Sequence, residues 1–292
     1  VNEDLAASMV WGSQQVGLFP GATKDGVFGI WYGKGPGVDR CGDVFRHANA
    51  AGTSRHGGVL ALAGDDHGAK SSTLPHQTDH TFYGLMMPIL YPSSVHEFVE
   101  YGLLGVALSR YSGCWVAFKV ISETIEVSAS VSLAGEKRQI LMPDTTEFEM
   151  PPGGVNIRLM HDWKDQDYLL QRYKLFAALV FAKKNHINRT IWDSPKPRFG
   201  IITSGKSYED VRQALWELGI TEKIAADIGL RLYKVGMPWP LEPDGVRHFS
   251  EGLEEVLVVE EKRELIENQI KQQLFNWRAD VRPNVLGKFD EG

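Results

Sequence analysis

Short apolar runs alternate with segments of helical spacing in the first half of the chain. The runs are VFGIWY (27–32), VLALA (59–63) and CWVAFKV (114–120). Continuous apolar runs of this length are typical of strands that are buried on both faces. Residues 95–108 instead repeat their apolar positions every three to four residues, as an amphipathic helix does. The alternation predicts a parallel sheet with helices on both faces.

A second and more regular α/β pattern begins at Phe199. Three apolar runs, FGIITSG (199–205), LRLYKVGM (230–237) and EEVLVVEE (254–261), are separated by helical segments and followed by a longer helix at 262–275. This βαβαβα order predicts a second open sheet. The fold class expected for the whole chain is therefore α/β, with two open, mostly parallel sheets and helices on both faces of each.

The polar stretch PDTTEFEMPPGGVN (143–156) separates the two patterns. We expect a first domain at 1–142, a linker with a helix at 143–197 and a second domain at 198–278. Residues 279–292 have no clear period and suggest a connector to a further domain. Because the first pattern opens with a helix and not a strand, we expect its sheet to lack a first strand and the chain to be part of a longer one.

The composition argues against several classes of function. The formal net charge of -6 over 292 residues gives no broad basic field, which argues against a nucleic-acid partner. Cys41 and Cys114 are too few and too far apart for a disulfide framework, an iron–sulfur centre or a zinc site. No apolar run is long enough to cross a bilayer. We expect a protein of the reducing cytoplasm with no membrane association.

The first residues carry a candidate acid. Asn2 can cap a helix, and Glu3 and Asp4 then lie in its first turn. An acid in this position complements the helix dipole, which is worth about 0.3–1 kcal/mol, so Glu3 by itself needs no further role.

Two loops that follow predicted strands hold further candidates. Gly35 and Gly37 lie in GKGPGVDR (33–40), which lacks both G-x-G-x-x-G and a G-K-[ST] ending, and therefore predicts a ligand-facing turn more than a phosphate site. The loop GDDHGAKSSTLPHQTDH (64–80) is rich in acids and histidines, but their spacing fits no common metal site. A polar active-site wall is the favoured interpretation, with a solvated loop as the alternative.

Considered together, these stretches resemble one enzyme family. The runs NEDLAASMVWGSQQ and FGIWYGKGPGVDRCGDVFRHANAAGTSRHGGVLALAGDDHGAKSSTLPHQ resemble the indolepyruvate ferredoxin oxidoreductases, which are thiamine-diphosphate enzymes. The later run GIITSGKSYEDVRQAL, with RLYKVGMPWPLEP and VLVVEEKRELIENQ, resembles the transketolase-C-like domain of the same family. The resemblance covers nearly the whole chain.

The resemblance implies roles for individual residues. Glu3 would bond N1′ of the aminopyrimidine ring of the cofactor and so activate it, which makes Glu3 the candidate catalytic residue. Gly35, Gly37 and Asp65, from the two loops after predicted strands, are the candidate cofactor-binding residues, and Gly64-Asp65-Asp66 departs from the G-D-G pattern with which the family binds the diphosphate. The candidates for the substrate side of the site, each of which could act on a proton or a carboxylate, are Arg40, His56, His67 and Arg110.

The family reaction is oxidative decarboxylation of an aryl 2-oxoacid to an acyl-CoA, with electrons passed to ferredoxin. The resemblance implies that Mg²⁺ and iron–sulfur clusters are held by regions absent from this chain and that no metal is held here. It also implies as partners the remaining domains, ferredoxin, coenzyme A and a second copy in a homodimer. We expect residues 1–292 alone neither to turn over nor to bind the cofactor tightly.

Two other functions stay open. The first is a non-redox thiamine-diphosphate enzyme of the decarboxylase or transketolase kind, and the second is a non-catalytic interaction module on the same fold. The sequence leaves the 2-oxoacid open as well. Trp31, Tyr32, Phe82 and Tyr83 suit either an aromatic pocket or the core, and the core is the commoner place for such residues.

Overall fold

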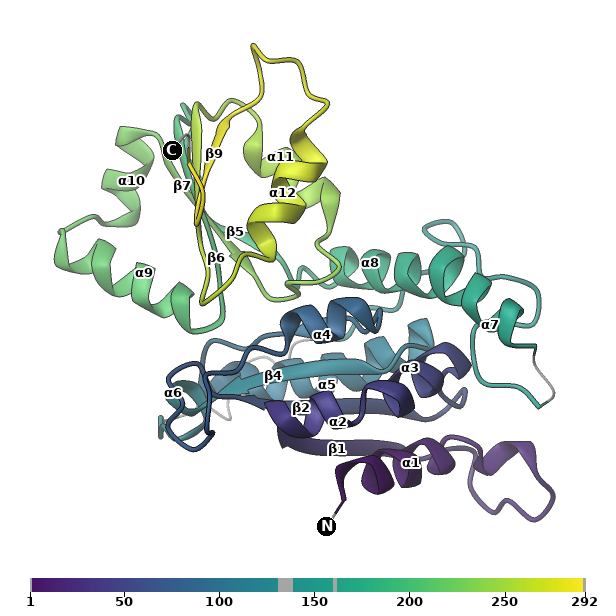
Figure 1. Ribbon diagram of the computed structural model, residues 1–292. Helices are drawn as coiled ribbons and strands as arrows, with labels where there is room; N and C mark the ends of the chain where they lie inside the picture. Colours follow the sequence, from purple (N-terminus) through teal and green to yellow (C-terminus); the bar gives the residue numbers. More distant parts are fainter. Residues whose placement is uncertain (1, 131–138, 160–161, 291–292) are drawn as a thin grey trace. The chain divides into compact units, whose positions relative to one another are not determined.

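The chain divides into two α/β units in the computed structural model, which describes residues 2–130, 139–159 and 162–290 (Figure 1). The first unit comprises residues 1–90 and 95–185, and the second comprises residues 91–94 and 186–292. Each has its own mostly parallel sheet with helices on both faces, so the predicted fold class is confirmed. The described residues between 143 and 185, which include the expected linker helix, belong to the first unit.

The first unit is built on a parallel sheet with strand order β1-β2-β4-β3. Its strands are β1 (Phe28–Lys34), β2 (Gly58–Asp65), β3 (Ile89–Leu90) and β4 (Val116–Ile121). Its helices are α1 (Glu3–Ser13), α2 (Gly35–Arg40), α3 (Gly42–Ala51), α4 (Asp79–Gly84), α5 (Val95–Ser112), α6 (Ser122–Ile125), α7 (Trp163–Leu169) and α8 (Leu175–Lys184), with a π-helical segment at Leu170–Lys174 and a 3₁₀ turn at Val16–Leu18.

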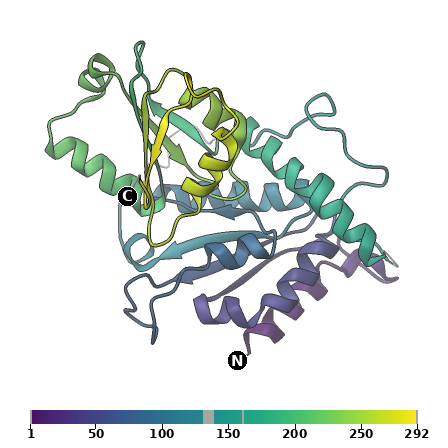
Figure 2. The ribbon, with the colours of Figure 1, turned by 45° about the horizontal axis from the view of Figure 1, so that its top comes forward.

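The sequence of the central strands explains their position. Every residue of β4 is buried, and β2 is buried along most of its length, as strands covered on both faces require. One face packs on α3 through Trp31 and Phe45, whose rings meet edge to face with centroids 4.9 Å apart. The other packs on α5 at Gly105, where an added Cβ would lie 2.7 Å from a Leu60 methyl carbon. Helix α1 runs beside the edge strand β1 (Figures 1 and 2).

The second unit has strand order β5-β7-β6-β8-β9. Its strands are β5 (Arg189–Trp192), β6 (Phe199–Ser204), β7 (Leu230–Val235), β8 (Glu255–Val259) and β9 (Asn284–Leu286), and its helices are α9 (Gly205–Glu217), α10 (Glu222–Ile228), α11 (Pro243–Ser250) and α12 (Ile266–Leu274). Strand β5 runs antiparallel to β7, whereas β6, β7, β8 and β9 are parallel.

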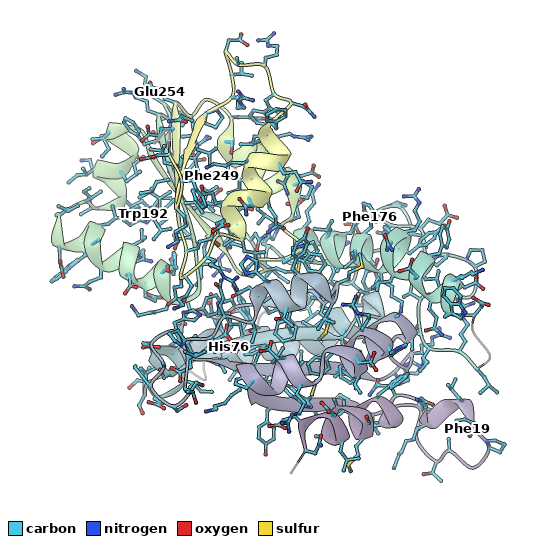
Figure 3. The ribbon with its side chains drawn as sticks, in the orientation of Figure 1. Phe19, His76, Phe176, Trp192, Phe249 and Glu254 are labelled. Carbon is cyan, nitrogen blue, oxygen red and sulfur yellow. The ribbon has the colours of Figure 1, made fainter. Side chains whose placement is uncertain are left out.

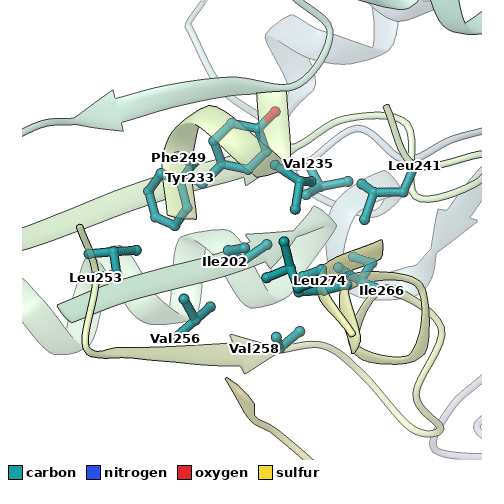
Figure 4. Packing of buried hydrophobic residues seen from close by; sticks show 12 residues of the cluster. Ile202, Tyr233, Val235, Leu241, Phe249, Leu253, Val256, Val258, Ile266 and Leu274 are labelled. Atoms are coloured by element: carbon teal, nitrogen blue, oxygen red, sulfur yellow. The ribbon is translucent and has the colours of Figure 1, made fainter. Parts of the chain in front are cut away.

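Two apolar clusters cover the two faces of the second sheet. One joins α9 and α10 to β7 through residues such as Val211, Ala225 and Leu232. The other joins α11 and α12 to the strands, and Figure 4 shows Phe249 lying against Tyr233, with ring centroids 5.1 Å apart. Within the described ranges no helix combines the length and the apolar character that a membrane crossing needs.

The elements that the sequence pattern missed are short. Strand β3 has two residues and β9 has three, and α2 has six, so none is long enough for an apolar pattern to repeat and be recognised. Strand β9 lies in the segment for which no period was predicted, and it pairs with β8 from Glu255↔Asn284 to Leu257↔Leu286. Long-range pairing, rather than local propensity, makes these residues a strand.

A buried lysine caps the C-terminal end of α3 in the first unit. Lys174 in the π-helical segment is 1% exposed, and its ammonium donates hydrogen bonds to the carbonyls of Asn49 (3.2 Å) and Ala50 (2.8 Å) in the last turn of α3. A cation at this position complements the helix dipole. Burial lowers the pKa of Lys174 to about 8, because the charged form loses its hydration.

Replacement of this lysine should change how stability depends on pH. The pKa of Lys174 is about 8 in the folded protein, against the ordinary lysine value of 10.5 expected in the unfolded chain. The unfolded chain therefore binds more protons between these values, and stability rises with pH there. We expect the stability of the wild type relative to Lys174→Met to increase by up to about 3 kcal/mol over this interval. Urea unfolding at several pH values measures this. The control Lys164→Met, at an exposed position, should show no such trend.

Candidate active site

A cavity of about 650 Å³ lies at the carboxyl halves of β1, β2 and β4 in the first unit. Helix α1, β1 and the short α6 supply most of its wall. The lining residues are Glu3, Ala6, Val10, Ile30, Trp31, Tyr32, Gly33, Lys34, Leu62, Gly64, Val120 and Ile125. Apolar side chains predominate, and Glu3 supplies the carboxylate. The carboxyl ends of parallel strands are where open α/β sheets bind ligands, so the cavity is the candidate active site.

Glu3 is held at this cavity by its backbone and by its side chain. The Asn2 side chain caps α1 by accepting from the N–H groups of Asp4 (2.9 Å) and Leu5 (3.2 Å). The Trp31 indole donates to the carbonyl of Glu3 (3.2 Å). The Glu3 carboxylate accepts from Arg40 Nη1 at 3.3 Å, and its side chain is 38% exposed.

The two glycines of α2 make room for side chains of the first unit. A Cβ on Gly37 would lie 3.0 Å from Glu3 Cγ, so this glycine lets the acid lie flat against α2. A Cβ on Gly35 would overlap the imidazole of His76. His76 is labelled in Figure 3. Its Nε2 also lies 2.8 Å from a carboxylate oxygen of Asp39 in α2. These contacts fix α2 between the Glu3 side chain and the loop that carries His76.

A buried group of charges lies at the carboxyl ends of β2 and β4. Lys119 Nζ is 2.6 Å from an Asp79 oxygen and 3.6 Å from an Asp65 oxygen, and all three side chains are at most 4% exposed. Burial by itself would raise the pKa of Asp79, but the adjacent Lys119 ammonium holds the pKa of that carboxyl below its usual range. Asp65 also accepts from the Thr78 backbone N–H, at 3.0 Å to each oxygen.

The loop after β2 is folded around a second aspartate. The Asp66 carboxylate accepts from the backbone N–H groups of Lys70, Ser71 and Ser72 at 2.7, 2.7 and 2.9 Å. These bonds, that from Ser71 above all, lower the pKa of Asp66 to about 2. The loop is joined to the cavity wall, because Lys34 Nζ donates to the Ser71 carbonyl at 2.7 Å.

Some of the predicted site residues come together and others do not. Arg40 forms an ion pair with Glu3 at 3.3 Å. His67 Nε2 lies 3.7 Å from an Asp65 oxygen, also at the carboxyl edge of the sheet. His56 is exposed in the turn before β2, and Arg110 Nε donates to the Gly57 carbonyl at 2.9 Å in that turn. His56 and Arg110 therefore lie at the amino end of the strands, away from Glu3.

Two lysines of the site were not among the residues that the sequence predicted. Lys119 is the single charged residue in the apolar run CWVAFKV, and that isolation was a usable sign of a buried ion pair. Lys34 ends β1 and gave no comparable sign. Of the four candidate aromatics, Phe82 is fully buried in the core, whereas Trp31 and Tyr32 line the cavity. Among the described residues, no three His, Cys, Asp or Glu side chains are arranged to hold a metal ion.

Comparisons with known proteins agree with the resemblance seen in the sequence. Residues 188–292 match the family model described as the indolepyruvate ferredoxin oxidoreductase middle domain. The indolepyruvate oxidoreductase subunit IorA of Methanothermobacter thermautotrophicus is 25% identical over 273 residues, which are 92% of this chain and 41% of the relative. IorA of Pyrococcus abyssi is 27% identical over 234 residues, 77% of this chain and 34% of the relative. The chain thus spans less than half of these relatives.

Solved structures give the same fold. A 2-oxoglutarate:ferredoxin oxidoreductase from Magnetococcus marinus aligns with a TM-score of 0.63 and 15% identity, over 98% of this chain and 53% of that one. A split-gene transketolase aligns with a TM-score of 0.56 and 12% identity, over 98% and 72%. At these identities the likeness concerns the fold. The family match and the relatives together confirm the resemblance to the indolepyruvate ferredoxin oxidoreductases.

The contact between Gly35 and His76 is open to a double-mutant test. We expect Gly35→Ala to cost about 1–3 kcal/mol of folding stability, because the new methyl group would overlap the imidazole. In a His76→Ala background the same change should be neutral or stabilising, since alanine favours a helix over glycine by up to about 1 kcal/mol. Gly42→Ala in α3, where an added Cβ meets nothing within 4 Å, is the matched control. An equal cost of Gly35→Ala in both backgrounds would contradict the assignment.

Proposed function

We propose that this chain, a relative of the indolepyruvate ferredoxin oxidoreductases, supplies the aminopyrimidine half of a thiamine-diphosphate site. The reaction proposed for the intact enzyme is oxidative decarboxylation of an aryl 2-oxoacid, with coenzyme A as acyl acceptor and ferredoxin as electron acceptor. The observation that carries the proposal is the position of Glu3, an acid at the start of α1 that lines a largely apolar cavity. The family match and the IorA relatives support the reaction class.

The residues of the cavity suit an aminopyrimidine ring. Ile30, Leu62 and Val120 offer apolar surface for a flat heterocycle, and Glu3 offers a carboxylate for one ring nitrogen. Thiamine diphosphate, when bound, supplies the electron sink for decarboxylation, so the protein has to bind, orient and tune it. In this role the Glu3 carboxylate would hold a proton at N1′ of the bound ring. Such a charge-assisted bond is stronger where water is excluded.

The neighbours of Glu3 would position its carboxylate and support the loop beside it. Gly37 leaves room for the Glu3 side chain beside α2, and Arg40 Nη1 donates to the Glu3 carboxylate at 3.3 Å. Lys34 is the cation on the cavity wall. Gly35 and Asp65 would act indirectly. Gly35 leaves space for the His76 ring, and the fully buried Asp65 carboxylate accepts a hydrogen bond from the Thr78 N–H and so holds the loop. His67 approaches the site from the same loop.

The rest of the enzyme would come from outside these residues. The chain spans 41% and 34% of the two IorA relatives, which leaves room for further domains. We assign to them the Mg²⁺ and diphosphate half of the site and the iron–sulfur clusters, and we expect ferredoxin, coenzyme A and a second copy of the protein as partners. This division accounts for the 38% exposure of Glu3, because a second half-site would have to cover it.

Glu3→Gln in the intact enzyme is the direct test. We expect it to lower the rate of 2-oxoacid-dependent ferredoxin reduction by at least about 100-fold, because glutamine cannot hold the proton on N1′ as a carboxylate does. The thermal midpoint should stay close to that of the wild type, because the side chain is partly exposed. Asp43→Asn, which changes an 89% exposed carboxylate on α3, is the matched control. A rate within a few-fold of wild type would favour a non-catalytic module.

Titration calorimetry tests the division into half-sites. Residues 1–292 alone, titrated with thiamine diphosphate and Mg²⁺, should show no binding in the micromolar range, because only one face of the cofactor would be contacted. The intact enzyme under the same conditions should bind. Micromolar binding to residues 1–292 would contradict a shared site.

A further inference from the structure

The carboxyl ends of β6 and β8 lie where the second sheet changes the direction of its connections. The connection after β6 leads to α9, which packs on one face of the sheet, and the connection after β8 leads to α12, which packs on the other. Since β6 and β8 are neighbours, the connections of the sheet switch from one face to the other between these two strands. Open α/β sheets bind ligands at such a switch point.

A four-residue segment, Tyr91–Ser94, lies against the strand ends at this switch point. The Tyr91 ring lies where a side chain on Gly205, the first residue after β6, would otherwise project, and the backbone of Gly205 has φ +50°. The Tyr91 hydroxyl donates a hydrogen bond to the Glu261 carboxylate, which follows β8. The Tyr91 N–H donates to the carbonyl of Gly236, just after β7, at 2.9 Å. One tyrosine thus contacts the ends of all three neighbouring strands.

Ser93 of this segment makes further hydrogen bonds to the second unit. Lys234 Nζ, near the end of β7, donates to Ser93 Oγ at 2.7 Å, and the same hydroxyl donates to Glu209 on α9 at 2.8 Å. Lys234 is 3% exposed and lies 4.1 Å from the centroid of the Tyr208 ring. A buried lysine and a carboxylate placed to bracket one hydroxyl group are what a polar ligand subsite requires.

We propose that residues 91–94 are an internal ligand of the second unit and that the switch point they occupy is a binding site for a phenol. In the folded protein the phenol is Tyr91. The segment is flanked in the chain by Leu90 and Val95, which belong to the first unit, so the second unit is completed by residues inserted in the sequence of the first. This site shares no residue with the lining of the Glu3 cavity, and the inference does not depend on the proposed function.

Chemical complementation tests the site in the intact protein. Tyr91→Ala should lower the thermal midpoint by removing a ring that is only 2% exposed. Millimolar p-cresol should then raise the midpoint of Tyr91→Ala by at least about 2 °C more than that of the wild type, because it refills the space. Toluene should raise it less, since it has no hydroxyl to donate to Glu261. Tyr83→Ala, at a tyrosine that is 52% exposed, is the control and should show no response specific to p-cresol.

Equal shifts of wild type and Tyr91→Ala, or equal effects of p-cresol and toluene, would overturn the proposal. A double-mutant cycle covers the case in which Tyr91→Ala folds poorly. Gly205→Ala should cost less stability in a Tyr91→Leu background than in the wild type, because the phenol ring that the methyl group meets is gone. The backbone strain at φ +50° is common to both arms and cancels. An equal cost in both arms would also overturn the proposal.

Discussion

The buried ammonium of Lys119 is the constraint on which the arrangement of the first unit depends. A lysine in a strand buried on both faces must find anionic partners, because an unpaired charge in such surroundings costs several kcal/mol. Asp65 and Asp79 supply these partners from the end of β2 and from the start of α4. The two acids thereby draw the ends of the loop 66–78 to the carboxyl edge of the sheet.

The position of the loop then determines the surroundings of Glu3. His76 near the end of the loop contacts Gly35 and Asp39, so that α2 is fixed, and α2 in turn presents Gly37 and Arg40 to the acid. Close approach explains both glycines, because at each one the space for a Cβ is taken by a side chain from another element. A chain of contacts therefore leads from a buried ion pair to a carboxylate on the cavity.

The second unit uses the same edge of its sheet differently. In the first unit the carboxyl ends of the strands border a cavity, whereas in the second a tyrosine and a serine from a distant part of the sequence occupy that position. The general rule that ligands bind at the carboxyl ends of parallel strands holds for both, if Tyr91 is counted as the ligand. The IorA relatives extend well beyond the region matched here, and the half-site proposed around Glu3 assigns the complementary groups to such regions.

Sequence by itself determined the class of fold and the best candidate acid. Continuous apolar runs mark central strands wherever a parallel sheet is covered on both sides, and the run with a single lysine carried a sign of the ion pair as well. The resemblance pointed to Glu3, which lies on the cavity. Arg40 and His67 follow strands of the parallel sheet and His56 and Arg110 precede them, so the two pairs lie at opposite edges, as a parallel sheet requires. Only the tertiary structure showed which side chains each of them contacts, because those partners come from other parts of the chain. Pairing at a distance likewise decided β9 and the place of Tyr91, since neither the three residues of β9 nor a single tyrosine has a period that local sequence could reveal.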